Sequence, residues 1–314
     1  MSGNHQEWHC PDCGLKIGVS GQIPRLFFQP SKEDELTGTI REFYNENPFP
    51  NYEEFDDLAG LMEKAGEGVF ARLLDEQIPF GSRVLECGCG TGQLSNFLGI
   101  AHRTVIGTDI AVNSLQIAED FRERHSLDRV YFLQMNLFHP VFADESFDVV
   151  ICNGVLHHTS DPLAGFRRLA RLVKPGGYFI VGLYHRWGRL FTDLRRLLYL
   201  LSGNRGRILD PRLRKARLGT SRSSAWFADQ YKNPHESKHT IKEVLGWLEE
   251  SSLEYLRSIP SPRFLEPFSD QTALFEPDPF PGRLELGLKE MSMLLTEDRE
   301  GGFFTMITRK GDAE

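Results

Sequence analysis

The stretch that decides the fold is Val84–Leu94, VLECGCGTGQL, in which an apolar run meets three glycines and two cysteines. Its first residues, Val84–Glu86, predict a short buried strand, and Gln93–Ile100 predicts the helix that follows. The turn between them contains Gly88, Gly90 and Gly92. Because glycine allows positive φ angles and close approach of the backbone, such a turn directs N–H groups at a ligand.

The two cysteines of this stretch raise the question of a metal or redox site. A metal needs further ligands, and the adjoining strand and helix already account for the glycines. We therefore expect Cys87 to pack against the sheet and Cys89 to lie on the loop beside the ligand.

An acid follows the next predicted strand. Thr104–Asp109 (TVIGTD) reads as that strand, and Asp109 comes 21 positions after Gly88. An acid at this place can bind the two hydroxyls of a ribose. Glycine turn and acid together predict a ligand that contains adenosine. The opposing interpretation of Asp109 is an ordinary helix cap.

Strand and helix patterns alternate through the middle of the chain. This alternation predicts an α/β fold of the Rossmann-like, doubly wound type, with a mostly parallel seven-stranded sheet and helices on both faces. The remaining strands are expected at Val130–Met135, Phe147–Cys152, Tyr178–Leu183, Leu253–Ile259 and Phe303–Thr308.

Several motifs in this region resemble those of class I S-adenosylmethionine-dependent methyltransferases with a type 11-like domain. The turn reads G-x-G-x-G, whereas dinucleotide sites use G-x-G-x-x-G, and Glu86 stands just before it. The resemblance is close over about residues 80–185 and looser in the final strands. The other matching segments are Thr108-Asp109, QMNL at 134–137, FDVVICNGVLHHTSDP at 147–162 and LVKPGGYFIVGLYH at 172–185.

This resemblance implies S-adenosylmethionine as cofactor and S-adenosylhomocysteine as product. It places the glycine turn around the methionine part, Glu86 near the ammonium group and Asp109 on the ribose. Asn136 stands where an aspartate is common, and an amide oxygen can still accept from the adenine amino group. The implied cofactor-binding residues are Glu86, Gly88, Cys89, Gly90, Gly92, Asp109, Ile110, Asn136, Leu137, Asn153 and Gly154.

Methyl transfer from a sulfonium is an in-line displacement that depends mainly on alignment of the nucleophile. A general base is needed only where the nucleophile must lose a proton. Histidines after the fourth strand, a tyrosine after the fifth and a polar segment at 229–240 supply candidates, and packing or a solvated loop is the alternative for each. The candidate catalytic residues are His157, His158, Tyr184, Tyr231 and His235.

The chain divides into residues 1–36, an extension with a CxxC; 37–79, an acidic and aromatic lid and helix; and 80–314, the methyltransferase domain. Cys10 and Cys13 resemble half of a zinc ribbon, so they are candidates for a structural zinc, although no second CxxC follows. A zinc module would be a hint toward RNA.

Residues 185–240 are expected to form an inserted helical, basic substrate cap. Its part at 186–222 carries eleven Lys or Arg against Asp193 and Asp210. Such a segment suits an anionic substrate, RNA or a membrane surface. The alternative is a cap whose charge is balanced by the acidic residues at 46–76.

Bulk composition limits the partners. The 314 residues have a formal net charge of −8, so the whole chain is not built to coat nucleic acid. No apolar run of 18 or more residues or signal peptide is visible, and five cysteines show no disulfide framework, which predicts a cytoplasmic protein without a transmembrane segment.

We therefore expect methyl transfer, most readily to a small molecule. The alternatives are a tRNA or rRNA methyltransferase, a non-catalytic cofactor-binding regulator and an NAD-dependent oxidoreductase, the last disfavoured by the glycine spacing. The sequence leaves the acceptor and the oligomeric state open.

Overall fold

The fold was analysed in a computed structural model of the chain. The structure describes residues 6–28, 35–50, 57–202, 227–263, 268–300 and 302–312.

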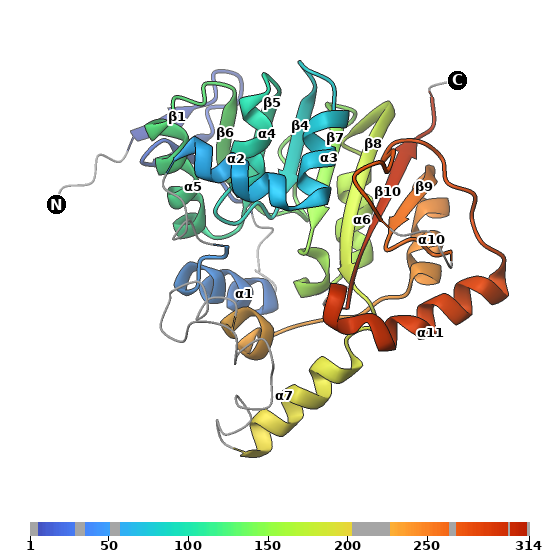
Figure 1. The fold of residues 1–314 in the computed structure, drawn as a ribbon. Coiled ribbons are helices and arrows are strands. Elements are labelled where there is room, and N and C mark those ends of the chain that lie inside the picture. The colour runs from blue at the N-terminus through green and yellow to red at the C-terminus, as the bar shows by residue number, and fades with distance from the viewer. Residues whose placement is uncertain are drawn as a thin grey trace.

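One sheet of ten strands runs through the molecule, in the order β1-β2-β3-β6-β5-β4-β7-β8-β10-β9 (Figure 1). Strands β3 to β8 pair in parallel, while β10 is antiparallel to both β8 and β9. The strands are β1 (Gln6–His9), β2 (Lys16–Ser20), β3 (Ile23–Leu26), β4 (Arg83–Cys87), β5 (Thr104–Asp109), β6 (Val130–Met135), β7 (Phe147–Asn153), β8 (Val173–Tyr184), β9 (Leu253–Ile259) and β10 (Phe303–Lys310).

From β4 onward the chain builds the parallel sheet outward from its middle, which determines where a ligand can bind. It proceeds from β4 outward to β5 and β6, then returns to the other side of β4 to form β7 and β8. The order of strands reverses between β4 and β7. In open parallel sheets, ligands bind outside the carboxyl ends of the strands at this switch point.

Helices cover both faces of the sheet, as predicted. Helices α2 to α5 pack on one face, where Val84, Val105 and Phe121 belong to one buried cluster. Helices α6 and α10 pack on the other, where Leu85 and Phe166 belong to a second. The helices are α1 (Glu35–Glu46), α2 (Leu58–Glu67), α3 (Val69–Gln77), α4 (Gln93–Ile100), α5 (Val112–Arg124), α6 (Pro162–Ala170), α7 (Leu190–Ser202), α10 (Ile241–Glu250) and α11 (Arg283–Glu300), with the short turns η1 (Leu156–His158) and η3 (Ala228–Lys232).

Successive residues of β4 show how the strand serves both layers. Val84 and Leu85 are both fully buried, and because side chains alternate along a strand, each reaches a different cluster. A strand that is buried on both faces explains why VLEC is a continuous apolar run apart from Glu86.

The fold class is confirmed, but the sheet is larger than expected. All seven predicted strands are present, and β1, β2 and β3 add an antiparallel meander within the extension at 1–36. The meander joins the sheet through β3, where Arg25 and Leu26 pair in parallel with Gln134 and Met135 of β6. Of these three strands, the burial patterns show only Val19, Ile23 and Pro24 as buried, so they lack the continuous apolar run that predicted β4.

Residues 174–177, whose Lys-Pro-Gly-Gly sequence is typical of a turn, lie within β8. Phe147 of β7 pairs with Val173, and Val149 pairs with Tyr178, so the four residues between these partners bulge out of the ladder. Lys174 Nζ donates to Asp148 Oδ1 at 2.6 Å across this irregularity. The Pro-Gly-Gly signal therefore marks a bulge in a longer strand.

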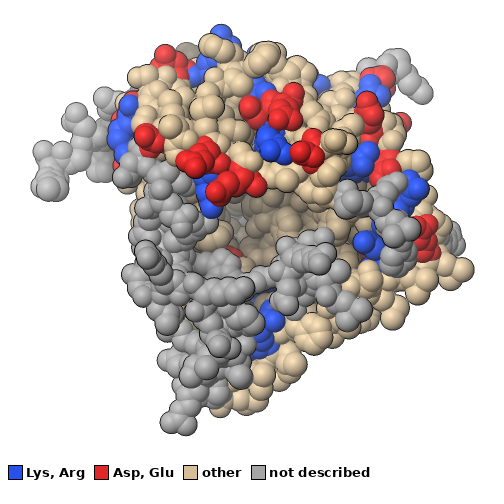
Figure 2. Space-filling model, in the orientation of Figure 1, with Lys and Arg blue, Asp and Glu red and all other residues tan. Residues whose placement is uncertain are grey.

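Of the inserted segment at 186–222, the structure describes α7 and the residues before it. Arg205, Arg207, Arg212, Arg214, Lys215, Arg217 and Arg222 lie outside the described residues. In Figure 2 charged side chains of both signs intermingle over the upper half of the molecule, and the surface below, towards α7 and α11, carries few. Across the ranges that the structure describes, the helices are too short or too polar to cross a membrane.

Candidate functional site

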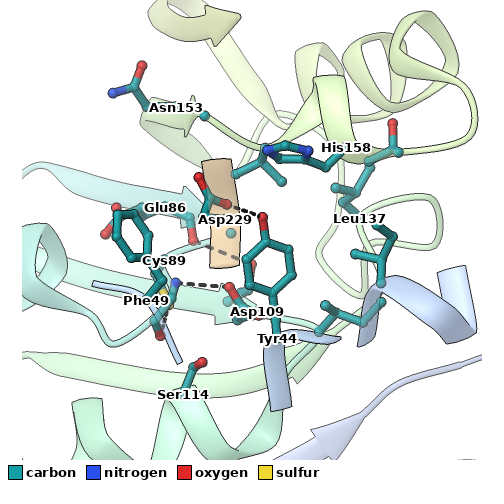
Figure 3. A pocket seen from close by; sticks show the side chains of 18 of the residues that line it. Tyr44, Phe49, Glu86, Cys89, Asp109, Ser114, Leu137, Asn153, His158 and Asp229 are labelled. Carbon is teal, nitrogen blue, oxygen red and sulfur yellow. Dashed lines mark hydrogen bonds between the residues drawn. The ribbon is translucent and has the colours of Figure 1, made fainter. Parts of the chain in front are cut away.

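A cavity of about 450 Å³ lies at the carboxyl ends of β4, β5, β6, β7 and β8, at the predicted switch point. Helix α1 contributes one wall and η3 another (Figures 1 and 3), and the surface is hollowed near the middle of Figure 2. The cavity is lined by twelve of the sequence-predicted site residues: Glu86, Gly88, Cys89, Gly90, Asp109, Ile110, Asn136, Leu137, Asn153, Gly154, His158 and Tyr184.

The glycine turn brings β4 and the segment after α1 into direct contact. Gly90 has φ +52°, and a Cβ at this position would lie 2.1 Å from the carbonyl oxygen of Phe49. Thr91 Oγ1 donates to the carbonyl of Pro50. Gly90 therefore has to be a glycine for both its backbone angle and its neighbour. Gly92 caps the start of α4 and does not line the cavity.

Asp109 is held by the backbone on both sides. Its Oδ2 accepts from the Gly90 N–H at 2.9 Å (Figure 3), and its Oδ1 accepts from the Ala111 N–H at 2.8 Å. Burial raises the pKa of this carboxyl, although the backbone donors oppose the rise. The side chain is thus fixed at the cavity wall with lone pairs left for a ligand.

Glu86 is a second carboxyl in the same wall, with only 8% of the residue exposed. Ser95 Oγ donates to its Oε2. Burial raises the pKa of Glu86 to about 7, and the neighbouring Asp109 adds to the rise. Two buried carboxyls together favour a ligand that brings positive charge and hydroxyl donors.

The remaining wall of this half is apolar. Ile110, Leu137 and Met135 line it, and Asn136 Oδ1 accepts from the Phe138 N–H at 3.0 Å. Gly154, at φ +83°, faces open space where a side chain would project. The apolar wall suits the flat ring of a nucleotide base, and Gly154 leaves open space next to it.

The cysteines of the opening stretch are structural. Cys87 and Cys152 are fully buried and Cys89 is 5% exposed. Burial raises the pKa of Cys87 to about 12, so its thiol stays protonated near neutral pH. Cys89 lines the cavity as a small apolar group.

The structure does not support the expected zinc at Cys10 and Cys13. Both thiols are free in the turn between β1 and β2, where the Cys10 N–H donates to Leu15 O at 2.9 Å. Over the described parts of the chain, no group of three or more His, Cys, Asp or Glu residues is arranged to hold a metal ion. Two thiolates alone do not complete a structural zinc site.

The two paired histidines have different surroundings. His158 lines the cavity, and its Nδ1 lies 2.8 Å from the carbonyl oxygen of His235. A carbonyl only accepts, so Nδ1 carries the hydrogen and the neutral ring keeps its lone pair on Nε2. Burial lowers the pKa of His158. His157 is fully buried behind it, 4.0 Å from the Tyr184 ring, with neither ring nitrogen hydrogen-bonded.

The other two candidates from 229–240 do not line the cavity. His235 reaches the site through its backbone carbonyl, and the Tyr231 ring stacks on Phe227 at 5.0 Å. Their neighbours Asp229 and Gln230 line it instead. Sequence reasoning missed these two because it treated 229–240 as a polar segment without helical structure, whereas Ala228–Lys232 forms a π-helical turn.

Comparison with known proteins agrees with this geometry. Residues 85–181 match the family model described as "Methyltransferase domain". The chain is 29% identical over 198 residues to an uncharacterized Synechococcus protein, covering 55% of this chain and 48% of that one. It is 29% identical over 222 residues to a ubiquinone biosynthesis O-methyltransferase of Escherichia coli, covering 70% and 75%.

A solved structure shares the fold. PKMT2 from Rickettsia typhi in complex with AdoHcy aligns with a TM-score of 0.55 and 14% identity, over 79% of this chain and 53% of that one. The chain spans about half the length of the first curated relatives it matches.

Fold, site and family model together define the class of protein: this chain carries an S-adenosylmethionine-dependent methyltransferase domain. The doubly wound sheet around this domain is the fold that the resemblance to class I S-adenosylmethionine-dependent methyltransferases implies.

Proposed function

We propose that this protein transfers a methyl group from S-adenosylmethionine to a small-molecule acceptor by in-line displacement. The observation that carries the proposal is the pair of buried carboxyls, Glu86 and Asp109, beside the glycine turn. Bound S-adenosylmethionine would supply an electrophilic methyl group on a cationic sulfur. Its ammonium group and ribose hydroxyls match the charge and the acceptor oxygens of these two residues.

Each part of the cavity then has a role in binding. The Gly88–Gly90 turn would hold the methionine part, with Glu86 towards its ammonium group. Asp109 would accept from the ribose, and Ile110, Asn136 and Leu137 would border the adenine. Asn153 and Gly154 would form the floor beneath the reacting methyl.

The other end of the cavity would receive the acceptor. Tyr44, His158 and Tyr184 line this end, and Tyr44 comes from α1, within the segment expected to act as a lid. His158 would act as general base through Nε2 wherever the acceptor must lose a proton. Most of the rate acceleration would come from alignment of the acceptor with the methyl group.

A small molecule is favoured over RNA because Arg189 and Arg196 of the insert form ion pairs within the protein. Arg189 Nη2 and Arg196 Nη2 each contact Glu236 Oε2 at 2.8 Å, and Arg189 is 1% exposed. The relative from Escherichia coli is likewise named for a small-molecule pathway.

Two measurements test the proposal. Calorimetry should show binding of S-adenosylmethionine and S-adenosylhomocysteine and none of NAD. Transfer of label from methyl-labelled cofactor should then appear in a metabolite pool and not in a tRNA or rRNA pool. Label in RNA alone would reverse the choice of acceptor, and cofactor binding without any transfer would favour a regulator.

A further inference from the structure

The acceptor end of the cavity contains a buried carboxylate that the methyl donor does not need. Asp229 of η3 lines the cavity and is 7% exposed. Its Oδ1 accepts from the Tyr44 hydroxyl at 2.9 Å, and its Oδ2 accepts from Gln230 Nε2 at 2.9 Å (Figure 3 shows Tyr44 and Asp229). These donors are neutral, so they orient the carboxylate without cancelling its charge.

The residues that carry a formal charge in the described lining of the cavity are all acidic. The lining includes the carboxyls of Glu86, Asp109 and Asp229, and among the lining residues that the structure describes there is no Lys or Arg. The sulfonium and ammonium groups of the donor offset the first two. Asp229 is left facing the acceptor.

A buried arginine lies close by but is engaged elsewhere. The guanidinium of Arg189 lies 3.8 Å from the centroid of the Tyr184 ring and does not line the cavity. Its Nη2 contacts Glu236 at 2.8 Å and its Nη1 donates to Gln230 Oε1 at 2.7 Å. The cation therefore supports the wall that carries Asp229.

We propose that Asp229 selects the acceptor, so that the substrate is a neutral phenol or alcohol and acids are rejected. This inference rests on the proposed methyl transfer. A carboxylate or phosphate beside the reacting atom would face Asp229 in a water-poor cavity, where like charges repel strongly. A neutral hydroxyl compound meets acceptor atoms there, and its apolar body fits against Leu36, Ile40 and Val155.

The chemistry of such an acceptor balances with the groups present. The acceptor oxygen forms a bond to the methyl carbon as the carbon–sulfur bond breaks, and the electron pair of that bond stays on sulfur. The hydroxyl proton passes to Nε2 of His158, which leaves a neutral thioether, a methyl ether and an imidazolium.

Paired probes test the selection. Catechol with protocatechuate, and naphthol with hydroxynaphthoate, differ within each pair only by a carboxylate. We expect the protein loaded with S-adenosylhomocysteine to bind the neutral member at least about tenfold more tightly by calorimetry, and labelled cofactor to show the same preference in transfer. Asp229→Asn keeps the shape and removes the charge, so it should shrink the ratio within each pair several-fold. Asp144→Asn, an exposed residue paired with Arg171, is the matched control and should leave the ratio unchanged.

Two results would overturn the selection: an acid bound or methylated as well as its neutral partner, or no binding of either neutral probe to the loaded protein. An unchanged ratio in Asp229→Asn would also count against it. Binding of S-adenosylhomocysteine is measured first, in the unaltered protein and in every variant. If the unaltered protein does not bind it, the proposed function itself is refuted.

Discussion

The carboxylate of Asp109 accepts from the backbone N–H of Gly90 at 2.9 Å and thereby joins the end of β5 to the turn after β4. One side chain thus shapes the glycine turn and presents oxygens to the cavity. An amide cannot accept from Gly90 and Ala111 with both of its side-chain atoms, because one of them is itself a donor.

Asp109→Asn should therefore weaken binding of S-adenosylmethionine by at least about tenfold, corresponding to roughly 1.4 kcal/mol or more. Calorimetry measures the change, and a circular dichroism spectrum checks that the fold is retained. Asp120→Asn, on the exposed side of α5, serves as the control and should bind normally. Full affinity in Asp109→Asn would remove this residue from the binding site.

Gly90→Val should abolish cofactor binding while the sheet remains folded. The new side chain would begin 2.1 Å from the Phe49 carbonyl oxygen and would require a positive φ that valine disfavours. Gly246→Ala in α10 has open space at its Cβ and should leave binding unchanged. If Gly90→Val bound the cofactor as well as Gly246→Ala does, the close contact between Gly90 and the Phe49 carbonyl would be refuted.

Cofactor affinity should rise with pH because of Glu86. Its pKa of about 7 means that the carboxyl becomes fully charged only above neutrality, and a cationic ligand prefers the charged form. We expect binding to be about five- to tenfold tighter near pH 8 than near pH 6. Calorimetry on Glu86→Gln should show weaker binding with a flatter pH profile.

The stability of the free protein should change in the opposite direction. The folded pKa of Glu86 lies above its unfolded value of 4.5, so between about pH 4.5 and 7 the folded state binds more protons. Stability contributed by the protonated group is present at low pH and lost as pH rises through this window. Thermal melts of Glu86→Gln lack this loss, and equal pH slopes for the two proteins would contradict the assignment.

Thiol reactivity should divide the cysteines into two groups. Cys10 and Cys13 lie in the first hairpin turn, and hydrogen bonds from neighbouring backbone lower the pKa of Cys10. We expect these two to react within minutes with a thiol-specific reagent and the other three only after unfolding. The double variant Cys87→Ala, Cys89→Ala should still bind the cofactor. Fast reaction of a third thiol in the native protein would contradict the burial of the other three cysteines.

The half of the cavity around the glycine turn could be predicted because it depends on short segments. A buried strand, a glycine turn and an acid at the next strand end place Glu86, Gly90 and Asp109 together through local structure and sheet topology alone. The strand–turn–helix pattern singled out Gly90 and Asp109 as ligand-binding residues, the family resemblance added Glu86, and all three line the cavity.

The acceptor half depends on contacts between distant segments. Tyr44 and Asp229 are 185 positions apart, and neither pattern around them indicates the other. The polar segment at 229–240 was singled out for Tyr231 and His235, whereas the side chains that line the cavity are those of Asp229 and Gln230, in the π-helical turn. A local irregularity of this kind leaves no periodic signal in a sequence.

The pairing of β3 with β6 has a consequence for the order in which the chain assembles. Arg25 and Leu26 find their partners more than 100 positions later, at Gln134 and Met135. Contacts of such long range form slowly, because the chain entropy lost in closing a long loop comes before any stabilising free energy from the contacts. During synthesis β3 can pair with β2 at once, but its other edge has no partner until β6 has been made. When this pairing forms, it places Leu26 beside Met135, which lines the wall of the finished cavity.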